Sequence, residues 1–263
     1  MIDPTLRFHA LVQGPEDDIR LDEAALLIAA HAEPGLDVDR WLTVLDDLAA
    51  RCDDPSFAGV VQHVRREGFT GNQDDYYDAR NSYLNHVIER RRGIPITLCI
   101  VVIEMARRVG VPAVGIGMPG HFLVRDARDM DAFADPFNGV FLDRAGCERL
   151  FSAVQPQLSF DDAYLAPVGR LAIVTRLLAN LKGIHLARRD RDALIWVLGL
   201  RVATPGTPAE ERRELASAFA ANGQFLEAAS TLDELADVAR VAGGGPLVDE
   251  AESGAIRLRA RLN

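Results

Sequence analysis

Apolar residues recur at helical spacing from Leu21 to Phe69. The series is interrupted at Pro34-Gly35 and again at Asp53-Asp54-Pro55, and both are combinations that favour turns. Three helices are therefore expected in this stretch. Together they predict an N-terminal helical layer over residues 1–73.

The pattern changes in the middle of the chain. Pro95 pre-sets the first turn of a helix over Ile96–Val109 that is apolar on nearly every side, so this helix belongs in the core. Gly110 ends it, and short apolar runs separated by turns then predict antiparallel strands. Residues 74–166 are thus expected to form an α+β core. The strands are expected at 111–118, 121–125 and 130–134, with an edge at 141–142 and a helix at 144–154 following.

Helical patterning returns beyond Pro167, in four or five segments, so residues 167–263 are expected to form a C-terminal helical region. Part of it follows the small-large spacing of a tetratricopeptide-like (TPR-like) helix pair. Arg240 stands where such a repeat usually closes with proline, so an ordinary helical pair remains the alternative. The spacing is carried by Leu215, Ala216, Phe219, Gly223, Phe225, Ala228, Leu232 and Leu235.

Composition limits the classes of partner. A chain of 263 residues can bury a large core, as one domain or, as we favour, two units. The net charge of −10 would repel a phosphate backbone, so no nucleic acid is expected. No apolar run reaches the roughly 18 to 20 residues of a membrane span, and Met1–Ala10 lacks a secretion signal. We expect no membrane association.

The three cysteines, Cys52, Cys99 and Cys147, are odd in number and widely spaced. They lack the paired spacing of metal ligands, which argues against a structural zinc site. Free thiols in a reducing compartment are the simplest interpretation. The sequence therefore predicts a cytoplasmic protein with no metal and no cofactor.

Two residues are arranged like the base and orienting acid of a thiol acyl-transfer site. His121 opens a strand directly after Pro119-Gly120, and Asp135 ends the next strand, so antiparallel pairing can bring the carboxylate to the imidazole. The core helix that starts at Pro95 would point its N-terminal amides toward the same place. A structural hydrogen bond that closes the hairpin is the alternative for this pair.

Four blocks of sequence occur in order: DDYYDARNSYL from Asp74, ERRRGIPITL from Glu89, PGHFLVR from Pro119 and DPFNG from Asp135. Together they resemble the SirB1 family of bacterial transglutaminase-like proteins. The resemblance is close over residues 74–142 and looser in the helical flanks, including the TPR-like C-terminus. It implies a transglutaminase-like, papain-type core with His121 as base and Asp135 as acid.

The nucleophile departs from the pattern of active transglutaminases. An ungapped match places their cysteine at Pro95, and SirB1 members commonly have serine where this chain has Thr97. A threonine hydroxyl is a poor nucleophile beside a bare His-Asp pair, and bonding of this hydroxyl to backbone is the structural alternative. Cys99 lies about 200° round the helix from Thr97, so both cannot face one cleft, and a buried apolar role is its alternative.

Further residues are candidates for binding. Arg92, Asn81 and Arg125 lie in the blocks that carry the resemblance and are predicted to line the cleft. Glu104, on the buried core helix, needs a partner, for which Arg80 and Arg125 are the candidates.

Two main functions follow. The first is a transglutaminase-like protein with a degenerate site that acts as a binding or regulatory module for a protein or peptide partner. The second is an amide hydrolase or acyltransferase that uses Thr97 or Cys99 with His121 and Asp135. A third is a small-ligand or anion pocket built from Arg92 and His121. Oligomeric state is left open.

Overall fold

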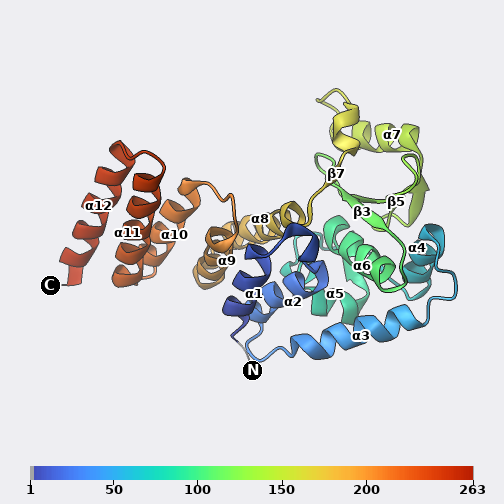
Figure 1. Ribbon diagram of the computed structural model, residues 1–263, viewed down its shortest axis with the longest axis horizontal. Helices are drawn as coiled ribbons and strands as arrows, with labels where there is room; N and C mark the ends of the chain where they lie inside the picture. The colour runs from blue at the N-terminus through green and yellow to red at the C-terminus, as the bar shows by residue number, and fades with distance from the viewer. Residues whose placement is uncertain (1–2, 263) are drawn as a thin grey trace. The chain divides into compact units, whose positions relative to one another are not determined.

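The computed structural model describes residues 3–262, and Figure 1 shows its helices and strands. The chain divides into two compact units, one up to Asn180 and the other from Leu181 onward. The division falls inside helix α8 (Arg170–Arg188), whereas the C-terminal region was expected to begin at residue 167, ahead of this helix. Within the described range, every helix is too short or too polar to cross a membrane.

Four helices form the first layer of the N-terminal unit. The three predicted between residues 21 and 69 are present, and a further one comes from the charged start of the chain, where the apolar pattern gave no signal. Ser56 illustrates how they begin, because its hydroxyl accepts the backbone N–H of Gly59 at 3.0 Å. The helices are α1 (Pro4–Gln13), α2 (Leu21–Ala32), α3 (Val38–Ala50) and α4 (Phe57–Arg66).

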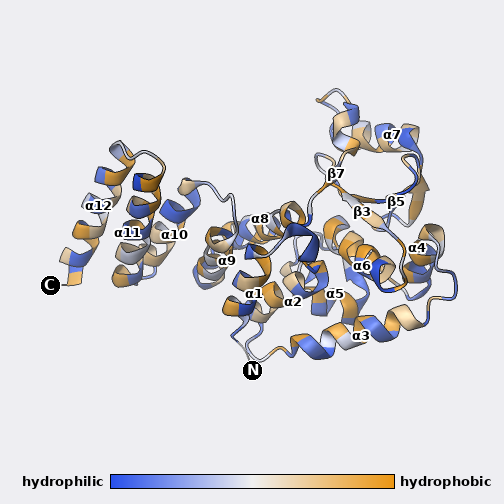
Figure 2. Ribbon diagram, viewed as in Figure 1, coloured by the Kyte–Doolittle hydropathy of each residue, from blue (hydrophilic) through white to orange (hydrophobic). Residues whose placement is uncertain are grey.

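Helix α6 (Pro95–Arg108) is the buried core helix that the sequence predicts. Helices α2, α3, α4 and α5 (Leu84–Arg90) all pack against it. Every residue from Pro95 to Ala106 is buried, and Figure 2 shows hydrophobic residues along most of its length. Proline fits its first position because that backbone N–H would have no partner within the helix.

The two ends of helix α5 are defined by the loops beside it. Tyr83 takes the N-cap position, while the side chain of the nearby Asn81 bonds to a loop carbonyl. The helix ends at Arg90, and Arg91 takes the left-handed conformation with φ of 58°. Gly93 is therefore free to pair in a short parallel ladder of β1 (Thr70–Gly71) with β2 (Arg92–Gly93).

A five-stranded antiparallel sheet packs against α6, in the order β6-β5-β4-β3-β7. Val124 of β4 lies opposite Gly115 of β3 on one side and Ala134 of β5 on the other. The α+β fold class is thus confirmed, although β7, with two residues, is too short to leave an alternating pattern. The elements are β3 (Ala113–Ile116), β4 (Leu123–Asp126), β5 (Phe133–Asp135), β6 (Val140–Leu142), β7 (Pro167–Val168) and the following helix α7 (Arg144–Val154).

The C-terminal unit is built from helices alone among its described residues, in agreement with the predicted segments. Helix α11 packs against both α10 and α12, and Figure 1 shows the three lying side by side. The small residues Ala216 and Ala228 are buried, as are Leu215 and Leu235. The helices are α9 (Arg191–Ala203), α10 (Ala209–Ala221), α11 (Phe225–Val241) and α12 (Pro246–Arg259).

Candidate functional site

His121 and Asp135 meet as the predicted strand order requires. His121 lies in the turn that leads into β4, and Asp135 is the last residue of the neighbouring strand β5. The imidazole Nε2 is 2.9 Å from Asp135 Oδ2, and the exposed fractions of the two side chains are 8% and 0%. The pair is therefore a buried contact between two adjacent strands.

The surroundings of Asp135 fix the role of each ring nitrogen. Its Oδ1 accepts the backbone N–H of Phe137 at 3.0 Å, and its Oδ2 accepts the side-chain amide of Asn138 at 2.6 Å. A carboxylate that receives these donors acts as an acceptor, so His121 Nε2 carries the proton of the shared hydrogen bond. Nδ1 is then the nitrogen left for other contacts, and it makes no hydrogen bond to a described residue.

Phe137 holds the His121 ring from a second side. The two rings meet edge to face, with centroids 6.1 Å apart. The Phe137 ring in turn lies against Gly71 so closely that a Cβ at position 71 would stand 2.5 Å from Cδ2 of the ring. The imidazole is thus fixed both by its hydrogen bond and by an aromatic contact.

A small pocket of about 150 Å³ opens beside His121. The start of α6 forms one wall through Pro95 and Ile96. The N–H groups in the first turn of a helix have no partner within the helix. The imidazole and the amino end of the core helix therefore converge on one hollow. Its other lining residues are Tyr76, Ile94, Gly120, Phe122, Arg176 and Asn180.

Arg176 of α8 is a pocket residue that the sequence does not reveal. Its Nη2 donates to the carbonyls of Met118 at 3.1 Å and His121 at 2.8 Å, and its guanidinium lies over the Phe122 ring at 5.3 Å. Burial lowers the pKa of Arg176. No carboxylate of the described chain pairs with it. The residue lies 55 positions beyond His121 and belongs to no motif, so no signal in the sequence could have identified it.

Comparisons with known proteins agree with this geometry. A family model described as the transglutaminase-like superfamily matches residues 41–179, more than half of the chain. A UPF0162 protein of Xylella fastidiosa is 38% identical over 207 residues, which are 71% of this chain and 73% of that protein. The chain belongs to the UPF0162 family of transglutaminase-like proteins.

Other relatives extend this family assignment. A UPF0162 protein of Pseudomonas aeruginosa is 34% identical over 64% of this chain and 65% of its own. F-box only protein 21 of Homo sapiens is 29% identical over 48% of this chain, which is 20% of that protein. No solved structure matches the chain.

Thr97, a candidate nucleophile of this transglutaminase-like chain, is fully buried, and its hydroxyl bonds to backbone. The hydroxyl lies 2.8 Å from the carbonyl of Asn81, to which it donates, and accepts the backbone N–H of Ile94 at 3.1 Å. A Cβ at position 93 would stand 2.7 Å from this hydroxyl, so Gly93 closes the space on that side. The structure does not bring the Thr97 hydroxyl to the pocket.

Cys99, the other candidate, is also fully buried and does not line the pocket. Its Sγ lies 3.5 Å from the carbonyl oxygen of Phe122. Burial raises the pKa of Cys99 well above its ordinary value, and the nearby Asp135 raises it further. Burial also raises the pKa of the Cys147 thiol to about 12. Cys52 is a free cysteine in the N-terminal helical layer. None of the three thiols reaches His121.

The three predicted binding residues lie outside the pocket lining. The Asn81 side chain is buried and donates to the carbonyl of Asp75 at 2.7 Å, which shapes the preceding loop. Arg92 is about half exposed and pairs with Asp74 at 3.1 Å. Arg125 is buried on β4 and donates to the carbonyl of Leu165 at 3.4 Å. The structure assigns none of them a contact with His121.

The expected partners of Glu104 were wrong. Arg80 pairs with Asp78, and Arg125 turns away, whereas the fully buried Glu104 carboxylate binds three other arginines. Two of these arginines lie three and four residues further along the same helix. Side chains at these spacings lie on the same face of a helix as the carboxylate. The partners are Arg107 at 2.6 Å, Arg170 at 3.2 Å and Arg108 at 3.6 Å.

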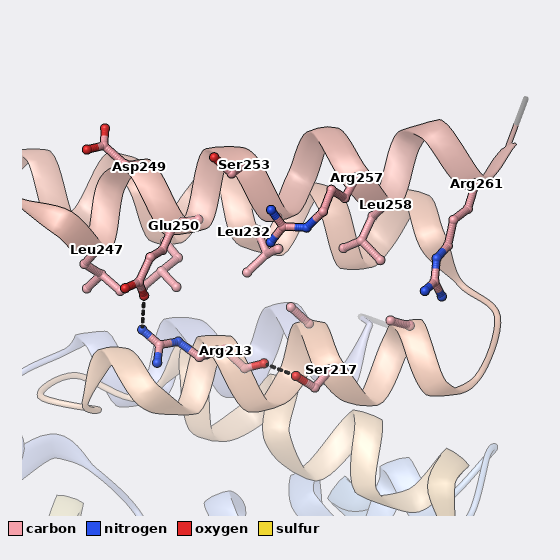
Figure 3. Close-up of a pocket in the computed structure, with 15 residues that line it drawn as sticks. Arg213, Ser217, Leu232, Leu247, Asp249, Glu250, Ser253, Arg257, Leu258 and Arg261 are labelled. Atoms are coloured by element: carbon pink, nitrogen blue, oxygen red, sulfur yellow. Dashed lines mark hydrogen bonds and ion pairs between the residues drawn. The ribbon is translucent and has the colours of Figure 1, made fainter.

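A separate groove of about 770 Å³ lies in the C-terminal unit, between α10 and α12 and over α11 (Figure 3). Leu232 and Leu247 line it, and Gly254 lets α12 approach, because a Cβ there would stand 2.7 Å from Leu232 Cδ1. Arg213 pairs with Glu250 across the groove at 3.4 Å. The groove thus combines an apolar floor with charged edges.

Metal ligation has no obvious place in the described part of the chain. Within residues 3–262, no group of three or more His, Cys, Asp or Glu side chains is arranged to hold a metal ion.

Proposed function

We propose that this protein is a binding module built on a transglutaminase-like core, with a catalytic site that has become degenerate. One observation carries the proposal: the pocket beside His121 is lined by neither a thiol nor an aliphatic hydroxyl. Pro95 occupies the position that the resemblance to active transglutaminases assigns to their cysteine. The His121 and Asp135 pair would then orient and bind a group rather than activate a nucleophile.

The chemistry of acyl transfer supports this interpretation. A covalent step needs a nucleophile within hydrogen-bond reach of its base. The Thr97 hydroxyl is engaged by backbone groups, and the Cys99 thiol is sealed in the core with a raised pKa. Neither could take up a substrate carbonyl without a rearrangement of α6.

The C-terminal helices support a role in binding a protein or peptide. The spacing of small and large residues in α10 and α11 is TPR-like, in agreement with the looser part of the SirB1 resemblance. The groove between α10 and α12 is large enough for a peptide segment. We include in the proposal that this helical region contacts a partner in the cytoplasm.

A gain-of-function variant tests the degenerate site. Iodoacetamide is added to the native chain and to Pro95→Cys, each in a Cys52→Ser background, at neutral pH, and the labelled residue is found by mass spectrometry. We expect Cys99 to stay unlabelled until denaturant is added, and the new thiol at 95 to react rapidly. The reaction at 95 should slow in Pro95→Cys/His121→Ala, because the imidazole no longer assists the thiol.

The opposite result would favour an amide hydrolase or acyltransferase that uses Thr97 or Cys99. Rapid labelling of native Cys99 that is lost in His121→Ala would place a working thiol in the site. Incubation of the native chain with p-nitrophenyl acetate tests whether the Thr97 hydroxyl acts as a nucleophile. A stable acetyl group on Thr97 that is absent in His121→Ala would also contradict the proposal. Cys147, which is buried in the hydrophobic core with Phe133 and Phe151, serves as the internal control for unfolding.

A further inference from the structure

The charges around the His121 pocket are not balanced. Arg176 brings a positive charge that no carboxylate of the described chain neutralises, and its guanidinium is in part buried, as the lowered pKa reflects. Its Nη2 is used by two carbonyls, while Nη1 and Nε make no hydrogen bond to a described residue. Arginine is rarely buried without an anionic partner, because loss of hydration is costly for a charged group.

The rest of the lining adds to this positive character. The amino end of α6 lines the pocket through Pro95 and Ile96 and brings the positive end of the helix dipole to it. None of the nine lining residues is acidic. The nearest carboxylate in this wall, Asp135, is turned behind the imidazole and is occupied by His121 and by the amides of Phe137 and Asn138.

His121 supplies a further polar group. Its side chain is more than nine-tenths buried and lines the pocket. Because Nε2 is held by Asp135, Nδ1 is the ring nitrogen that has no partner in the described chain.

We propose that this pocket binds a carboxylate group, held by the amino end of α6 and the guanidinium of Arg176, beside the His121 ring. The proposal rests on the proposed function, since it names the class of ligand that the same site would take. A volume of about 150 Å³ is well below the several hundred cubic ångströms of a site for a whole drug-sized molecule. The pocket therefore fits the end of a ligand, such as the C-terminus of a peptide or a small carboxylic acid.

The planar carboxylate matches these donors better than a neutral amide does. An amide presents only one oxygen and brings two N–H donors, which would face the guanidinium and the helix amides. Hydrogen bonds between charged groups are also roughly twice as strong as those between neutral ones. The proposal therefore predicts that the pocket binds a carboxylic acid more tightly than the corresponding amide.

Titration of the full ¹⁵N-labelled chain, followed by two-dimensional NMR, tests the proposal. The probes are N-acetylglycine, N-acetylglycinamide and propionate at constant ionic strength. We expect saturable shifts of the Ile96 and Thr97 amides and of the Arg176 Nε–H with the two acids, and at least about tenfold weaker binding of the amide. N-acetylglycine binding more tightly than propionate would identify a peptide C-terminus; equal affinity would identify small carboxylic acids.

Variants locate the contact. Arg176→Gln removes the charge and should weaken acid binding about tenfold or more, whereas Arg176→Lys should retain part of it. Arg92→Gln is the matched control, since it removes an arginine from the same unit that is already paired with Asp74, and it should leave affinity unchanged. Equal affinity for acid and amide in the native chain would overturn the proposal, and this comparison does not depend on whether a variant folds.

Failure of this inference is distinguishable from failure of the proposed function. Covalent labelling by mass spectrometry reports on a nucleophile, and the NMR titration reports on reversible binding. An absence of saturable shifts at 96, 97 and 176 would remove the carboxylate site and leave the degenerate catalytic site untouched. A His121-dependent adduct would do the reverse.

Discussion

Two buried carboxylates in the N-terminal unit have opposite surroundings. Glu104 is bound by three arginines and by the backbone N–H of Leu21, so its negative charge is more than matched. Among the described residues, Asp135 is bound by backbone and side-chain amides and one imidazole, and by no arginine. The cation near that second site, Arg176, forms no ion pair with a carboxylate of the described chain.

This difference separates charge that stabilises the fold from charge that is available to a ligand. Around Glu104 each charged group already has a partner, and the network joins α2, α6 and the start of α8 within one unit. Around His121 the donors outnumber the acceptors that the described chain supplies. Three variants can break or sharpen the comparison.

The largest effect is expected at Glu104. Glu104→Ala leaves Arg108, whose side chain is 7% exposed, with one fewer partner and removes the acceptor of Leu21 N–H. The free energy of unfolding should fall by about 3 kcal/mol or more. Trp41 fluorescence in urea, in a Trp196→Phe background, reports on the N-terminal unit.

Asp46→Ala is the control for this variant. Asp46 also pairs with Arg108, at 2.7 Å, but its side chain is 64% exposed. Its removal should cost less than about 1 kcal/mol. A similar loss in both variants would mean that burial of the Glu104 network does not determine its contribution.

A second matched carboxylate, Glu211 of the C-terminal unit, gives a smaller effect that depends on pH. Arg201 holds the pKa of Glu211 below its ordinary value of 4.5, with help from Lys182. The stabilisation is therefore present above pH 4.5 and is lost as the pH falls through the folded-state pKa. Glu211→Gln should lower stability by about 2 kcal/mol at neutral pH.

The measurement compares the native chain with Glu211→Gln in urea between pH 7 and pH 3, read by Trp196 in a Trp41→Phe background. The gap in the free energy of unfolding should narrow below pH 4.5. A constant gap over this range would show that the ion pairs do not carry the effect.

The smallest effect on stability is expected at His121. In His121→Gln, Asp135 keeps its three amide donors, so the free energy of unfolding should change by about 1 kcal/mol or less. Affinity for N-acetylglycine should also fall, because the ring that lines the pocket beside Arg176 is lost. Destabilisation as large as that of Glu104→Ala would instead favour a structural bond that closes the hairpin.

The central helix and the strands beside it were predictable because their signals are local. Pro95 begins α6 and Gly110 follows its end. Because the residues between them are apolar on nearly every side, the sequence predicts that this helix is buried. The meeting of His121 and Asp135 followed from the order of two adjacent antiparallel strands. Residues 144–154 likewise match the predicted helix because Asp143 caps it.

The contacts made by long-range packing were not predictable. Arg176 reaches the pocket because α8 lies against the turn before β4, and no spacing rule connects positions so far apart. Thr97 looked available because its hydroxyl sits at the start of a helix, but the Asn81 carbonyl that occupies it comes from a separate loop. Such partners depend on how distant segments approach one another, which a single sequence does not encode in a local pattern.

The contact of Phe137 with Gly71 has a consequence for residues far from the pocket. A methyl group at position 71 would collide with the phenylalanine ring, which in turn contacts the His121 imidazole. The identity of a glycine in a two-residue strand is thereby tied to the alignment of a histidine fifty positions later. Because a hydrogen bond and an aromatic contact already hold the imidazole, the pocket would be preorganised for the anion that we propose it binds.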